Sequence, residues 1–89
     1  MGKIFVAVEA YTENCIGSVG FISCIDAYTT KEEAYAKIRK NYTGTDNECN
    51  IHEHMMTQAD GRTVLEATCS YSDFEGNEIR WTVKEIDIP

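Results

Sequence analysis

Proline, basic side chains and long apolar runs are all scarce in this chain of 89 residues. No apolar stretch approaches the ~18 residues that a membrane-spanning helix needs. The apolar run after Lys3 stops at Glu9, and no small-residue cleavage site follows it, so the sequence does not predict a signal peptide. The length suits one hydrophobic core. We therefore expect a single domain, residues 1–89, in the cytoplasm.

Motifs that carry catalytic chemistry are missing as well. None of the four cysteines forms a C-x-x-C pair, so neither a zinc ribbon nor a redox motif is predicted. Cys24, Cys49 and Cys69 lie in apolar strand patterns, where a reduced thiol behaves as a small buried hydrophobe. The chain has no G-x-S-x-G, no P-loop and no G-x-G-x-x-G. We expect no enzymatic activity and no cofactor.

The nearest approach to a metal-binding pattern is His52-x-His54. On a strand these imidazoles point to the same side, about 6.5–7 Å apart, and could share a cation. A third ligand would have to come from elsewhere, with Glu53 and Glu66 as candidates. Two polar residues on the solvent face of a strand have the same spacing. Metal binding by His52 and His54 is therefore an alternative rather than the main prediction.

The hydropathy pattern predicts four to five strands. Alternating or β-branched runs indicate them at residues 3–11, 19–28, 49–57, 63–71 and from 79 onward. The first two strands should form a hairpin with its loop near residues 12–18, and Asp60-Gly61 marks a second hairpin turn. In the last strand the apolar positions change parity after Val83, which predicts a bulge or bend near Lys84-Glu85.

The single helix is the most sharply marked element. Two overlapping capping boxes precede it, Thr29 with Glu32 and Thr30 with Glu33. Its apolar stripe consists of Ala34, Tyr35, Ile38 and Tyr42. Gly44 is expected to end it, because glycine readily adopts the left-handed conformation that stops a helix.

These elements follow one another in the order β-β-α-β-β-β. The order predicts an α+β fold, an antiparallel sheet with one helix packed on one face. Trp81 is expected at the centre of that packing, with its indole N–H hydrogen-bonded.

The charge is lopsided, with 15 acidic against 8 basic residues. Residues 1–44 hold five of each, so the whole formal net charge of −7 falls in residues 45–89, where ten acids face three bases. Direct binding of nucleic acid by this half would be repelled. Acidic side chains spaced along strands and turns can instead imitate phosphates toward a basic protein.

The densest acidic segment is the turn from Asp73 to Glu78, where three carboxylates surround Phe74. Its spacing is not that of a calcium-binding EF-hand loop. The candidate partner-binding residues are Asp73, Phe74, Glu75, Glu78, Glu66 and Asp60. An ordinary solvated turn has the same composition, and the sequence leaves that interpretation open.

A resemblance to known proteins centres on residues 27–42, AYTTKEEAYAKIRKNY, which link a strand pair through a helix to a closing meander. In this arrangement the chain resembles small uncharacterised proteins common in phage and mobile-element genomes. The resemblance covers about a fifth of the chain and implies neither an activity nor catalytic residues. It implies a small inhibitor of host defence, of the anti-CRISPR kind, acting in the host cytoplasm.

The sequence therefore predicts a small acidic, non-enzymatic protein-binding module, an inhibitor or DNA mimic whose partner is a basic, nucleic-acid-binding protein. A small-ligand or metal-binding domain is one alternative. A self-associating module, such as a homodimer, is another, because a lone sheet with an uncovered face and exposed edges tends to pair.

Overall fold

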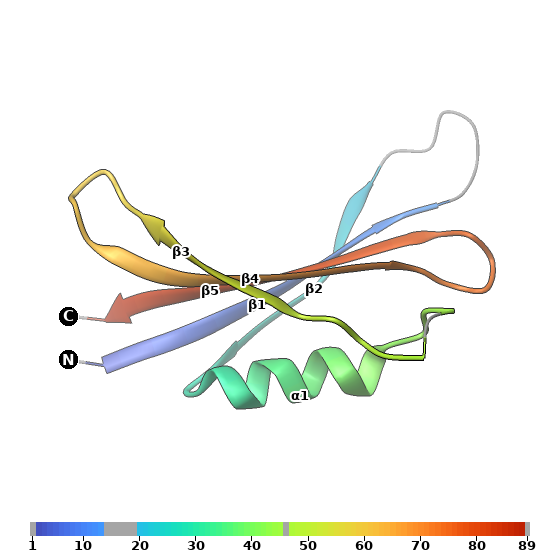
Figure 1. Cartoon of the computed structure of the whole chain (residues 1–89), viewed down its shortest axis with the longest axis horizontal. Coiled ribbons are helices and arrows are strands. Elements are labelled where there is room, and N and C mark those ends of the chain that lie inside the picture. Colours follow the sequence, from blue (N-terminus) through green and yellow to red (C-terminus); the bar gives the residue numbers. More distant parts are fainter. Residues whose placement is uncertain (1, 14–19, 46, 89) are drawn as a thin grey trace.

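The computed structural model describes residues 2–13, 20–45 and 47–88. The elements are β1 (Gly2–Thr12), β2 (Phe21–Tyr28), α1 (Lys31–Asn41), β3 (His52–Thr57), β4 (Thr63–Ser72) and β5 (Glu78–Ile88). The five strands form one antiparallel sheet, and α1 lies across one of its faces (Figure 1). The predicted α+β class, with an antiparallel sheet and one helix, is confirmed. No helix in this part of the chain has the length and apolar character needed to cross a bilayer.

The strands lie in the sheet in the order β2-β1-β5-β4-β3. The sequence pattern supplied only the order along the chain and left the number of strands at four to five. The spatial order differs from the order along the chain because β5 returns to pair with β1. The first and last strands therefore lie side by side in the middle of the sheet (Figure 1). The hairpin turn predicted at Asp60-Gly61 is confirmed, with Gly61 at a φ of 88° between β3 and β4.

The prediction of a bulge near Lys84-Glu85 is wrong. β5 pairs with β1 in an unbroken register from Gly2↔Ile88 to Thr12↔Glu78. The apolar positions change parity because Ile86 is opposite Ile4 on the sheet face away from α1, whereas Trp81 and Val83 face the helix. The last strand is therefore apolar on one face at its start and on the other face at its end.

A bulge does occur in β2. The register between β1 and β2 shifts between Glu9 and Ala10, which leaves Ser23 as the additional residue. The Ser23 hydroxyl donates to the Glu9 carboxylate at 2.7 Å. Most of the loop expected near residues 12–18, and Cys15 with it, lies outside the described residues.

The core lies between α1 and the sheet. Its buried members are Ala7, Ala34, Tyr35, Ile38, Ala67, Cys69, Tyr71, Ile79, Trp81 and Val83. Trp81 is wholly buried, which confirms its predicted place in the core. The prediction of a hydrogen bond for its indole N–H is wrong. No group among the described residues accepts from that nitrogen with good geometry. The Tyr71 hydroxyl donates instead to the Asn41 carbonyl oxygen at 3.3 Å. Burial raises the pKa of Tyr71, and the contact with the Trp81 indole lowers it by a smaller amount.

The helix begins as the capping signal predicts. The backbone N–H of Glu33 donates to the Thr30 hydroxyl oxygen at 3.3 Å, and the Thr30 hydroxyl donates to the Glu33 carboxylate at 3.1 Å. Thr29 also donates to Glu33, at 2.9 Å, instead of forming its own box with Glu32. The buried stripe of α1 is Ala34, Tyr35 and Ile38.

The end of the helix differs from the prediction. The C-cap is Tyr42 in an extended conformation, and Gly44 has no positive φ. Gly44 is needed for space, because a Cβ there would lie 2.5–2.6 Å from atoms of the Tyr42 ring. That ring packs edge-on against Tyr71, with ring centroids 4.7 Å apart.

Candidate functional site

The structure does not gather the six candidate partner-binding residues into one patch. Asp60 lies in the turn that precedes β4, whereas Asp73 and Phe74 lie in the turn that follows it, so β4 separates the two turns (Figure 1). A strand of this length holds its ends about 30 Å apart. Glu66 lies between them on β4, opposite His54 on β3. Only the turn at residues 73–78 brings several candidates together.

Three of the predicted acids are already paired with bases of the same chain. The Asp60 carboxylate accepts from the backbone N–H and the guanidinium of Arg62, and these bonds hold its pKa below the ordinary value. The other pairs are Glu66 with His54 at 3.4 Å and Glu78 with Arg80 at 3.2 Å. Asp60 and Glu78, which pair with arginine side chains, therefore offer a partner less free charge than the sequence suggests.

Asp73 organises the turn between β4 and β5. Its carboxylate accepts from the side-chain amide of Asn77 at 3.0 Å and from the backbone N–H groups of Asn77 and Glu75, each at 2.9 Å. These bonds, that of the Asn77 side chain first, lower the pKa of Asp73. Gly76 supplies the positive φ of 82° that the turn requires. The turn is thus held in one conformation by its own side chains.

Phe74 projects from this turn with 83% of its surface exposed, the highest value among the large apolar residues described as exposed. The surroundings are negative. The pKa of Tyr11 is raised, first by desolvation and then by the charges of Asp73, Glu13 and Glu75. An apolar ring therefore stands within a cluster of carboxylates at one end of the sheet.

The split of charge along the sequence is not a split in space. Because β5 pairs with β1, Glu85 from the acidic half meets Lys3 from the neutral half, with 3.5 Å between the ammonium nitrogen and a carboxylate oxygen. Lys31 at the start of α1 likewise donates to Glu53 on β3 at 3.0 Å. Two acids of residues 45–89 thus pair with bases of residues 1–44, so the two parts of the sequence are not separated in space.

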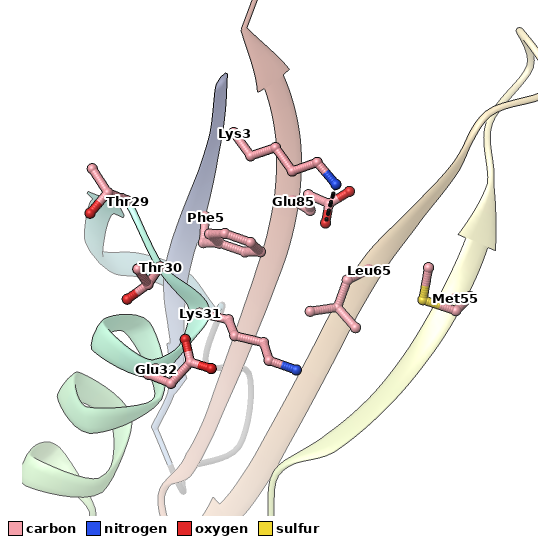
Figure 2. A pocket seen from close by; sticks show the side chains of 9 residues that line it. All are labelled: Lys3, Phe5, Thr29, Thr30, Lys31, Glu32, Met55, Leu65 and Glu85. Atoms are coloured by element: carbon pink, nitrogen blue, oxygen red, sulfur yellow. Dashed lines mark ion pairs between the residues drawn. The ribbon is translucent and has the colours of Figure 1, made fainter. Parts of the chain in front are cut away.

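A hollow of about 440 Å³ lies beside the start of α1 (Figure 2). Its apolar lining comes from Phe5, Leu65 and Met55. Its polar lining comes from Lys3, Thr29, Thr30, Lys31, Glu32 and Glu85. The Lys3–Glu85 ion pair crosses one side of it, as the dashed line in Figure 2 shows. The sequence pattern did not predict this hollow, because its lining comes from four strands and the helix start.

The predicted metal ligands lie on two sides of the sheet. His54 is opposite Glu66 in the register, whereas Glu53 points to the helix side and accepts from Tyr35 and Lys31. No three side chains of the metal-binding types converge anywhere in the described ranges. The imidazole of His54 is instead paired with Glu66.

Sequence reasoning missed one close pair of side chains. The sulfur atoms of Cys49 and Cys69 lie 3.5 Å apart, and both thiols are free. Burial is the main reason why the pKa of Cys69 is raised to about 12. The two residues are 20 positions apart in the chain and share no motif, so no local signal could have predicted their contact.

The exposed groups that the fold brings together are suited to recognition. An exposed aromatic ring can act as the apolar anchor of an interface, and charged side chains around it can form a polar rim. Searches of protein-family models, curated proteins and solved structures found no match to this chain. The functional argument therefore rests on the geometry of the described residues.

Proposed function

We propose that this protein is a small acidic, non-enzymatic binding module whose turn at residues 73–78 docks on a basic protein surface. The observation that carries the proposal is Phe74, which is 83% exposed on a turn that Asp73 holds in place. An anchor that is ordered before binding loses little conformational entropy in the complex. Phe74 would supply the apolar contact, and Glu75 with its acidic neighbours would supply the charged rim.

The expected partner is a protein with a basic, nucleic-acid-binding surface. A negative rim steers the approach of a positive surface and specifies the register of the complex. Occupation of that surface would exclude nucleic acid, because both ligands need the same basic side chains. In agreement with the resemblance to phage and mobile-element proteins, the proposal is an inhibitor of a host-defence protein, acting in the cytoplasm.

The test uses the immobilised protein and a lysate of host cells at low and at moderate salt. We expect a stoichiometric partner that duplex DNA displaces and that moderate salt releases, since the contact is charged. Phe74→Ala and Glu75→Lys should each abolish recovery. Asp73 is left unchanged, because its substitution would disorder the turn itself.

Two matched controls accompany these variants. Met55→Ala shortens another exposed apolar side chain, and Glu32→Lys reverses a charge on α1, far from the turn. Both should retain the partner. Equal loss from all four variants, or a partner that resists both salt and DNA, would show that the acidic turn is ordinary solvated surface.

A second candidate function is the binding of a small amphipathic molecule in the hollow beside α1. The specific observation is an apolar lining of Phe5, Leu65 and Met55 beneath a charged rim. Decanoate at millimolar concentration should then raise the melting temperature, because a ligand that binds only the folded state stabilises it. Met55→Trp should fill the hollow and remove the shift. No shift with the native chain would reject this candidate.

A further inference from the structure

The face of the sheet away from α1 is apolar along β1 and β2. Strand registers place side chains alternately on the two faces, and the face that holds Ala7 and Trp81 packs against the helix. The apolar residues on the opposite face, here called the open face, are Ile4, Val6, Val8, Ala10, Ile22, Ile25, Ala27, Met56, Val64, Ile86 and Ile88, of which Val64 is already buried within one copy of the chain. They form a continuous stripe along β1 that extends onto β2 and onto the end of β5.

Much of this stripe is in contact with solvent. Ile22 and Ile25 on β2 are among the most exposed large apolar residues, with 62% of the Ile25 surface accessible, and Ile86 and Ile88 are also exposed. Across the described residues, no element packs against the open face, because α1 lies on the other side (Figure 1). Continuous apolar patches of this extent are uncommon on monomeric proteins and mark interaction surfaces.

The open face is also electrically neutral. Its charged residues are Glu66, Glu78, Arg80 and Lys84, two acids and two bases, and its remaining titratable groups are His52 and His54. The formal net charge of −7 therefore comes entirely from other parts of the chain. A basic partner would gain little electrostatic energy on this face. A second copy of the same acidic chain, by contrast, can pack here without placing two negatively charged surfaces against each other.

The dimensions of the sheet match those of a dimer interface. Five strands about 4.8 Å apart, with a mean length of about 30 Å, give a face of roughly 700 Å². A stable interface of standard size buries about 800 Å² on each partner. Two such sheets can pack about 10 Å apart, with their apolar side chains interdigitated.

We infer that the open face is the interface of a homodimer with two-fold symmetry, in which the apolar stripe along β1 of one copy packs on the same stripe of the other. A two-fold interface uses one self-complementary patch, so a neutral stripe through the middle of the sheet is a suitable centre for it. The arrangement also explains the change of parity in β5, since Ile86 and Ile88 would be buried in the dimer. The inference does not depend on the acidic turn.

The experiment is sedimentation and light scattering of the untagged chain across the micromolar range, under reducing conditions. The native chain should show a concentration-dependent shift to twice its mass. Ile25→Glu should weaken the dimer by about a hundredfold or more, because the introduced carboxylate is buried twice in a symmetric interface. Ile86→Glu should weaken the dimer in the same way. Ile86 lies on the interior strand β5, so this substitution would not affect a dimer formed by pairing of two β2 edge strands.

The matched control is Met55→Glu. Met55 is 60% exposed on edge strand β3, but it points to the helix side of the sheet, so this variant should keep the native dimer constant. Circular dichroism should show that all variants remain folded. A native chain that stays monomeric overturns the inference, and so does a dimer insensitive to Ile86→Glu, which would indicate edge pairing.

Salt separates this inference from the proposed function. Association of two acidic chains through a neutral face should be unchanged or strengthened by added salt, because salt screens their mutual repulsion. Binding of a basic partner at the turn should weaken under the same conditions. A dimer that dissociates as salt rises would be held by charge pairs and would contradict the open-face interface. Phe74→Ala and Glu75→Lys should leave the dimer unchanged, so either proposal can fail while the other stands.

Discussion

Glu53 shows how one side chain joins the helix to the edge of the sheet. Its carboxylate lies on β3 and accepts hydrogen bonds from the Tyr35 hydroxyl and the Lys31 ammonium, both on α1. The Tyr35 bond, followed by that of Lys31, lowers the pKa of Glu53 from its ordinary value of 4.5. The pKa of Tyr35 is raised, first by burial and then by the same bond. These three residues are the main polar link between α1 and β3.

Tyr35→Phe tests this link. The variant keeps the buried ring and removes one hydrogen bond, so we expect a loss of about 1 kcal/mol in the free energy of unfolding at neutral pH. Chemical denaturation measures it. The control is Tyr28→Phe, because the Tyr28 hydroxyl makes only a 3.4 Å contact with Asp26. Equal losses of unfolding free energy in the two variants would show that the Tyr35–Glu53 hydrogen bond contributes no more than the longer Tyr28–Asp26 contact.

The same variant should change the response to acid. A carboxyl group whose folded pKa is lowered contributes stability above its ordinary pKa of 4.5, and this contribution is lost as the pH falls through the folded value. In Tyr35→Phe the folded pKa of Glu53 should move back toward 4.5. The gap in stability between the native chain and the variant should therefore narrow below pH 4.5. A gap that is constant across this range would contradict the role of Glu53.

At the scale of elements, the contact of Cys49 with Cys69 ties the segment before β3 to the middle of β4. Oxidised glutathione should convert the pair to a disulfide, with release of two molecules of reduced glutathione. We expect the reaction to begin at the half-buried Cys49, because Cys69, with a pKa of about 12, stays protonated. Closing a loop of this length should stabilise the fold by about 3 kcal/mol.

Thermal unfolding with and without oxidation measures the gain, and peptide mapping identifies the bond. Cys49→Ser should abolish the gain, whereas Cys24→Ser should not, because Cys24 contacts Asp26 instead. A disulfide that maps elsewhere, or one that lowers the melting temperature, would show that the two backbones cannot approach closely enough.

The elements themselves were predictable where the signal is local. The start of α1 depends on Thr30 and Glu33, three residues apart, and the turn at Gly61 depends on its own dipeptide. The parity change after Val83 is also local, but its cause is not, because Ile86 meets Ile4 from the other end of the chain. A hydropathy pattern shows that a face of a strand is apolar and does not show which face of the sheet α1 covers.

At the scale of the whole molecule, the placement of charge was the least predictable property. The acidic residues 45–89 follow the neutral residues 1–44, and the sequence pattern alone suggested an acidic half. Insertion of β5 between β1 and β4 brings the two halves together, so that pairs such as Lys3 with Glu85 form across the boundary. Within the candidate site, the turn around Phe74 was predictable from composition. The structural role of Asp73 within that turn was not.

This arrangement predicts how the stability depends on salt. The ion pairs of the chain have charged atoms within 4 Å of each other, and exposed pairs of this kind each contribute little. The excess of −7 acts over longer distances as a repulsion that destabilises the compact state. Because the screening length is about 10 Å at 0.1 M salt, the long-range repulsion is screened before the short pairs are. Sodium chloride should therefore raise the melting temperature by a few degrees, as calorimetry at fixed protein concentration would show.

Glu48→Lys, which reduces the excess charge, should show a smaller rise. Ile25→Glu, which adds one negative charge and weakens the dimer, should still show a rise, because the repulsion acts within one chain. A melting temperature that falls with added salt would mean that the ion pairs outweigh the repulsion.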